Sequence, residues 1–146
     1  MKFNEKDDKN SNDIKEYITQ LDISLANMEK IGSAFLVAGY ANYILAANLD
    51  ILRSLDENNI EQTAEEGFVF GQKLVLLGYI LLFIVSSKRL NEREFRNTYN
   101  DENNNLNLYS SVLYSYLLSI VANLIRFEAF VQIANEIREM EEEKNK

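Results

Sequence analysis

The stretch that decides the fold is VFGQKLVLLGYILLFIVSS, residues 69–87. It is the most hydrophobic part of the chain, and its single charged residue, Lys73, stands near its start beside Gln72. As a helix it rises about 29 Å at 1.5 Å per residue, which matches the roughly 30 Å hydrocarbon thickness of a bilayer. The stretch therefore predicts a transmembrane helix.

Two further segments carry no charge: IGSAFLVAGYANYILAANL at residues 31–49 and LNLYSSVLYSYLLSIVANLI at residues 106–125. Each is moderately apolar and long enough to cross a bilayer. The three segments together predict membrane spans at about 31–52, 68–88 and 107–127. The expected fold class is all-α, a small polytopic membrane helix bundle with three transmembrane helices and an N-terminal amphipathic helical extension.

The N-terminal extension is predicted from apolar side chains that recur at helical spacing from Ile14 to Met28. This helix either runs straight into the first span or bends near Gly32. Residues 1–13 are charged and lack periodicity, which predicts a disordered tail.

The remaining polar segments are assigned by the same reasoning. We expect loops or frayed helix ends at 53–67 and 88–105, a single helical membrane domain over 14–138, and a charged C-terminal tail at 139–146.

A soluble all-α bundle is the alternative reading of the three apolar segments. A helix on the surface of a soluble protein normally carries charges on its exposed face at every turn or so. These segments run four or five turns with at most one charge, and 146 residues are too few to bury three such helices on all sides. The pattern favours a membrane protein over a soluble interaction module.

The flanking charges predict how the chain is oriented, because cytoplasmic loops collect Lys and Arg. The polar segments before the first span and after the second are rich in basic residues: Lys2, Lys6, Lys9, Lys15 and Lys30, then Lys88, Arg89, Arg93 and Arg96. The linker after the first span has one basic residue, Arg53, among acidic ones. We therefore expect a multi-pass protein of the cell membrane with a cytoplasmic N-terminus and an outer C-terminus.

The composition excludes several function classes. The chain has no cysteine and no histidine, so thiolate chemistry, the commonest metal ligand and the usual general base are missing. No nucleotide-binding or hydrolase motif occurs. We expect a non-enzymatic protein without cofactor or metal, and the net charge of −8 argues against a nucleic-acid partner. Abundant Asn, Lys and Ile without Pro or Trp is typical of AT-rich bacteria.

Small and polar residues form a ridge along two of the predicted spans. The ridge of the third span consists of Ser111, Ser115, Ser119 and Asn123, and that of the first consists of Ala34, Ala38, Asn42 and Ala46. Such ridges let transmembrane helices approach each other closely, but they can also line a water-filled path. Gly67 and Gly71 form a GxxxG motif at the edge of the second span, where the match is weak.

Charged residues near the span ends are the other candidates. Those at the outer end are Asp50, Arg53, Lys73, Arg126 and Glu128, which either reach the interface or act inside the membrane. The basic cluster Lys88, Arg89, Arg93 and Arg96 is a candidate for anionic lipid headgroups at the inner end. The carboxylates of Glu92 and Glu94 are expected to be solvated.

These observations predict a small bacterial membrane protein that acts by helix packing, as a homo-oligomer or as an accessory subunit of a membrane complex. Its expected partners are membrane lipids and either a second copy or another membrane protein. A pore-forming component, like a holin or toxin, is the second hypothesis, in which the serine ridge faces water.

Overall fold

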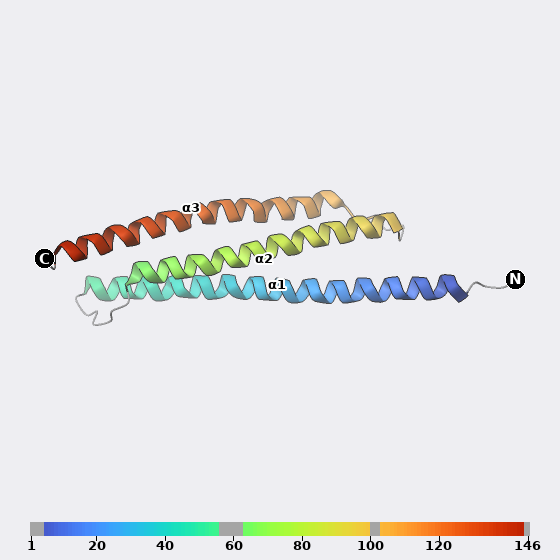
Figure 1. Ribbon diagram of the computed structural model, residues 1–146, viewed down its shortest axis with the longest axis horizontal. Coiled ribbons are helices and arrows are strands. Elements are labelled where there is room, and N and C mark those ends of the chain that lie inside the picture. The colour runs from blue at the N-terminus through green and yellow to red at the C-terminus, as the bar shows by residue number, and fades with distance from the viewer. Residues whose placement is uncertain (1–4, 56–62, 100–102, 145–146) are drawn as a thin grey trace.

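The computed structural model describes residues 5–55, 63–99 and 103–144. In these ranges the chain forms three helices, α1 (Glu5–Ser54), α2 (Ala64–Tyr99) and α3 (Leu106–Lys144), and contains no strand. Helix α2 lies between the other two and runs antiparallel to both (Figure 1). Helices α1 and α3 each pack on α2, but among the described residues no Cα atom of α1 lies within 8 Å of one of α3. The all-α prediction is confirmed.

The helices are longer than the spans predicted from the sequence. Helix α1 has 50 residues, which at 1.5 Å per residue is about 75 Å, and it passes Gly32 without a break. It begins at Glu5, inside the segment predicted to be a disordered tail; residues 1–4 lie outside the described residues. A segment attached to a formed helix continues its hydrogen-bond ladder without a new nucleation step, and this outweighs the modest helix propensity of the Asp, Asn and Ser residues there.

Helices α2 and α3 also run past their predicted ends. Helix α2 continues to Tyr99 through the segment 88–99, predicted as loop or frayed helix, and α3 continues to Lys144. The extension of α2 lies alongside α1 (Figure 1) and forms ion pairs with it. Those ion pairs explain why a polar segment remains helical there.

The interface between α1 and α2 repeats every seven residues. On α1 its buried positions are Ile18, Leu25, Gly32, Gly39 and Ala46. On α2 a matching row at the same spacing consists of Ala64, Gly71, Gly78, Val85 and Glu92, and further buried residues such as Gly67, Val75 and Leu82 flank it. A strict seven-residue repeat keeps one seam of each helix facing its partner through a left-handed supercoil. The two helices therefore stay in contact along most of their length.

The centre of that interface is made of glycine on both sides. A Cβ atom added to Gly78 would lie 2.8 Å from the carbonyl oxygen of Gly32, and one on Gly67 would lie 2.9 Å from the Cβ of Ala46. Only glycine and alanine allow two helix backbones to approach so closely. Van der Waals contact between backbones thus holds α1 on α2.

Helix α3 is attached to α2 in a different way, through separate side-chain contacts. The ring of Tyr116 packs on Tyr79 with centroids 6.4 Å apart. At the turn, the Asn97 side chain donates to the Asn104 carbonyl oxygen at 2.9 Å and accepts from its main-chain N–H at 2.8 Å. These contacts pin the end of α2 to the start of α3.

Most of the apolar surface of the three helices remains uncovered. In the most apolar windows of α1, α2 and α3, 11%, 39% and 6% of the residues are buried. The chain exposes 10706 Å², whereas a soluble globular protein of 16.9 kDa exposes about 7,700 Å². Each helix is long and apolar enough to cross a membrane. Together they indicate a small multi-pass membrane protein.

Candidate functional site

A buried glutamine joins all three helices toward the end of the bundle where α1 ends and α2 begins. We name this the outer end, and the opposite one the inner end, after the orientation that the charge bias predicts. Gln72 of α2 is fully buried. Its side-chain oxygen accepts a hydrogen bond from the hydroxyl of Tyr43 on α1. Its amide nitrogen donates to the main-chain oxygen of Asn123 on α3 at 2.8 Å and to the side-chain oxygen of Asn123 at 2.9 Å. Both ends of the amide are therefore paired, as a polar group without access to water requires.

Asn123 extends this network along α3. Its amide nitrogen donates to the carbonyl oxygen of Ser119 at 2.8 Å, and its side-chain oxygen also accepts from Arg126 at 3.3 Å. We call Tyr43, Gln72, Asn123 and Arg126 the polar node. The node fixes the rotation and the height of α3 relative to the α1/α2 pair, because hydrogen bonds are directional.

Aromatic rings cover the node on its outer side. Phe130 of α3 lies 5.6 Å from Phe68 and 5.9 Å from Tyr43, and Tyr43 lies 5.7 Å from Phe68, all measured between ring centroids. The contact of Tyr43 with Phe130 connects α1 to α3, whose backbones stay apart. Edge-on and tilted rings of this kind pack favourably and exclude water from the amides beneath them.

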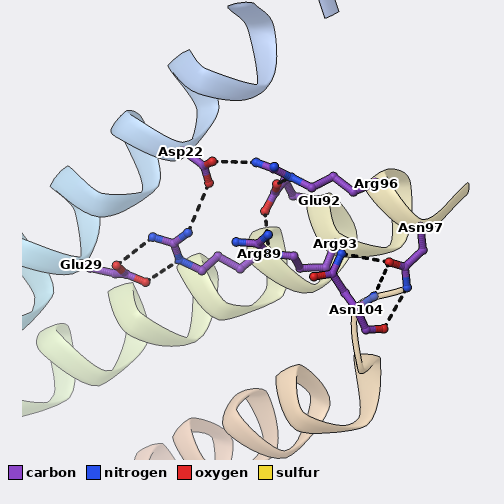
Figure 2. Close-up of polar contacts among 8 residues, drawn as sticks. All are labelled: Asp22, Glu29, Arg89, Glu92, Arg93, Arg96, Asn97 and Asn104. Atoms are coloured by element: carbon purple, nitrogen blue, oxygen red, sulfur yellow. Dashed lines mark hydrogen bonds and ion pairs between the residues drawn. The ribbon is translucent and has the colours of Figure 1, made fainter. Parts of the chain in front are cut away.

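A second polar cluster lies at the inner end, where the extensions of α1 and α2 run side by side (Figure 2). Arg89 of α2 donates to both carboxylate oxygens of Glu29 on α1, at 2.6 and 2.9 Å. Arg96, two turns further along α2, donates to Asp22 at 2.6 Å, and Arg89 also approaches Asp22 at 3.5 Å. We call Asp22, Glu29, Arg89, Glu92, Arg93 and Arg96 the inner ionic network.

The expectation that Glu92 is a solvated carboxylate is wrong. It is 4% exposed, lies in the α1/α2 interface, and pairs with Arg96 one turn later. Its other oxygen lies 3.5 Å from Nε of Arg93, whose guanidinium stands over the ring of Tyr109 on α3, 5.5 Å from its centroid. A buried carboxylate needs such cationic partners; Glu92 finds both on α2, and one of them, Arg93, also contacts α3.

The outer end has its own ion pair between α1 and α2. Arg53, near the end of α1, donates to both carboxylate oxygens of Glu65 in the first turn of α2, at 2.8 and 3.0 Å. The paired fork geometry fixes the direction of both side chains. Like Arg89 and Glu29 of the inner ionic network, this pair lies just beyond the predicted spans.

The two predicted ridges lie mostly away from the helix contacts of this chain. Ala46 is buried against Gly67 and Asn123 belongs to the polar node, whereas Asn42 and Ser119 are half-buried. The fully exposed members are Ala34, Ala38, Ser111 and Ser115. A packing role for these exposed residues needs a second protein and stays a prediction.

The buried seam of α1 has a different period from the predicted ridge, which follows steps of four from Ala34. The glycine seam runs in steps of seven through Gly32, Gly39 and Ala46, and it faces glycines 71 and 78 of α2. Small residues seven apart on two neighbouring helices were the signal that would have found this interface. The Gly67/Gly71 motif, weak by its place in the sequence, faces α1.

Of the charged candidates at the outer end, Asp50, Lys73, Arg126 and Glu128 are exposed on the helices. At the inner end, Arg89, Arg93 and Arg96 are held by carboxylates of the chain itself, while Lys88 is exposed. Headgroup binding by this cluster stays a prediction, and the internal ion pairs compete with it.

Within the described residues, no group of three or more His, Asp or Glu side chains is placed to hold a metal ion. No protein-family model matches this chain, and no curated protein or solved structure is similar to it. The function must therefore be argued from the geometry.

Proposed function

We propose that this chain is a non-enzymatic membrane protein that works by lateral association, presenting the outward face of α3 to a second copy or to another membrane protein. In this proposal α1 and α2 form a rigid pair, and α3 is the recognition helix. The ridge residues Ser111 and Ser115 lie on the recognising face.

The observation that carries the proposal is the uncovered surface of α3. This helix contacts only one flank of the bundle, and 6% of its most apolar window is buried. Ser111 and Ser115 are exposed, and each hydroxyl donates to a carbonyl of its own helix, at 2.9 and 2.7 Å. Hydroxyls already paired in this way can lie in an apolar surface, and small side chains let a second helix approach closely.

The polar node supports the same proposal, because it fixes which face α3 turns outward. A helix held by apolar contacts alone can rotate in the bundle, whereas the bonds between Gln72 and Asn123 define one rotation. The exposed serines are thereby kept away from the chain's own helices.

Membrane insertion is tested first, by expression and carbonate extraction. An integral membrane protein stays in the pellet after carbonate and enters solution only with detergent. Recovery of the chain in the carbonate supernatant would establish the soluble all-α alternative.

Lateral association is tested by cysteine crosslinking, for which the cysteine-free chain is a clean background. Ser111→Cys and Ser115→Cys should crosslink to another protein in membranes. Leu117→Cys is the matched control, since Leu117 is also exposed but lies about 200° around the helix from Ser115. A product of twice the chain mass identifies a homo-oligomer, and a heavier adduct identifies another subunit.

Two results would contradict lateral association. One is the absence of crosslinks at both serines in membranes where the protein is folded. The other is ion leakage from liposomes containing the purified protein, reduced by Ser115→Leu, which would favour the pore.

A further inference from the structure

Two adjoining hollows lie between α2 and α3 at the outer end of the bundle. The hollow nearer the middle of the bundle, of about 240 Å³, is lined by Phe70, Lys73 and Val131 among others. The outer one, of about 270 Å³, is lined by residues that include Arg138 and Glu141. Both share Glu66, Ala134 and Asn135 as lining residues. They thus follow one another from the apolar span toward the water.

On the α2 wall of the hollows the charge changes sign along this direction. Lys73 lies nearest the middle of the bundle, Glu66 follows about two helical turns further out, and both are exposed in the hollow. No ion pair or side-chain hydrogen bond joins either side chain to another of the described residues, in contrast to Arg53 and Glu65 close by. The cation Lys73 and the anion Glu66 are therefore available to a ligand that carries a negative group beside Lys73 and a positive group beside Glu66.

Asn135 adds a directed donor between them. Its side-chain oxygen accepts from Arg138 at 2.9 Å, which leaves its amide N–H groups for a ligand acceptor. The apolar wall around Phe70 and Val131 continues the hollow toward the membrane interior. The arrangement is therefore an open apolar hollow on the surface, with donors for an anion at its outer edge and a carboxylate further out.

We propose that these hollows bind the headgroup of an aminophospholipid, phosphatidylethanolamine, with its phosphate at Lys73 and Asn135 and its ammonium at Glu66. In this lipid the phosphate lies on the membrane side and the ammonium follows two carbons further out, which is the order of charges on the wall. The lysine stem can extend toward the interface, so its ammonium comes closer to Glu66 than the two-turn separation suggests. The acyl chains then lie along Phe70 and Val131.

The same chemistry discriminates against other headgroups. The quaternary ammonium of phosphatidylcholine has no N–H to donate to Glu66, and phosphatidylglycerol offers no cation to this carboxylate. A charge-assisted hydrogen bond is among the strong ones. One such bond of about 1.4 kcal/mol corresponds to a tenfold preference.

Native mass spectrometry of the full-length protein, purified in detergent, tests this proposal. The protein is incubated with equal amounts of phosphatidylethanolamine, phosphatidylcholine and phosphatidylglycerol that carry identical acyl chains. We expect about tenfold more bound phosphatidylethanolamine than either competitor. Lys73→Met and Glu66→Gln should each lower the amount of bound phosphatidylethanolamine about tenfold. Lys15→Met and Glu94→Gln, both exposed at the opposite end of the bundle, are the matched controls and should bind as the wild type does.

Three results would overturn the proposal: equal retention of the three lipids, a preference for phosphatidylglycerol, or unchanged binding in both pocket variants. Retention of no lipid by the folded wild type would do the same. Circular dichroism at 222 nm checks that each variant is helical, and either pocket variant suffices if the other fails to fold. The proposal depends on membrane insertion, which carbonate extraction tests independently, but not on lateral association through α3.

Discussion

Gly39 of α1 and Gly71 of α2 lie with backbone against backbone. A Cβ atom added to Gly39 would lie 2.7 Å from the carbonyl oxygen of Gly71, and one added to Gly71 would lie 2.8 Å from that of Gly39. Non-bonded atoms do not approach so closely, so neither residue can be replaced without moving a helix. This pair sets the distance between α1 and α2.

Replacing Gly39 by leucine should therefore force α1 away from α2. Overpacking of a tight interface typically costs about 1 to 3 kcal/mol, and here the obstacle is backbone that cannot rotate aside. We expect the midpoint of thermal unfolding in detergent to be lower, as measured by circular dichroism at 222 nm.

The neighbouring Ala38→Leu is the matched control, because Ala38 is exposed. It adds side-chain bulk on the same turn and should leave the midpoint nearly unchanged. Equal effects of the two substitutions would show that the glycine contact does not determine stability.

The same glycines show how far the sequence predicts the fold. Charge-free length was enough to predict three helices and their spans, since a bilayer imposes one minimum length on every span. The packing seam was not found, because the ridge from Ala34 to Ala46 and the seam through Gly39 share one end and differ only in period. The choice between them depends on residues of α2, which α1 by itself does not reveal.

Gln72→Leu should loosen α3 from the α1/α2 pair. The substitution removes the acceptor of the Tyr43 hydroxyl and one of the two donors to the side-chain oxygen of Asn123. A buried polar group that loses its partner costs about 1 to 3 kcal/mol, although interhelical bonds in membranes average nearer 0.6 kcal/mol. We expect a loss within that range, measured as the free energy of unfolding in detergent.

A double-mutant cycle with Asn123→Leu separates the bond from general effects of the substitutions. If the bond exists, the double variant should be more stable than the sum of the single losses implies, because either single substitution already removes the bond and it cannot be lost twice. Strict additivity would exclude the direct interaction. Asn42→Leu is the control, since Asn42 donates only to Ala38 of its own helix.

The ion pairs of the inner ionic network could not be predicted from the sequence. Basic residues after the second span suggested lipid headgroups, and Glu92 looked like one carboxylate among many. Their pairing depends on Asp22 and Glu29, which lie about 60 to 74 residues earlier in the chain. Such long-range pairs follow from the antiparallel register of two helices, not from any local pattern.

Arg89→Gln should remove the ion pairs of Arg89 with α1 and so loosen the contact between the inner extensions of α1 and α2. The predicted spans should be unaffected. Partly exposed ion pairs are worth about 1 kcal/mol at most, so amide hydrogen exchange in residues 14–30 should become about fivefold faster. Exchange in residues 31–52 should be unchanged. Lys88→Gln serves as the control, because Lys88 is the adjacent exposed cation, and acceleration of similar size in this variant would contradict the ion-pair role.

The ends of α1 and α3 provide a test of topology in two steps. The C-terminal ends of both helices lie at the same end of the bundle, and the extension of α2 lies at the opposite end (Figure 1). Single cysteines at Ser54 and Glu142 should therefore react alike with a membrane-impermeant maleimide, and one at Glu94 should react oppositely. All three positions are exposed, so a difference in labelling reports the side of the membrane and not burial.

The charge bias then predicts which side each position occupies. With the Lys- and Arg-rich segments retained in the cytoplasm, cysteines 54 and 142 should be labelled on intact cells, and cysteine 94 only after permeabilisation. The reverse pattern would leave the three-span arrangement intact and overturn the orientation. Labelling of 54 without 142 would contradict the arrangement itself, because a third span must return α3 to the side where α1 ends.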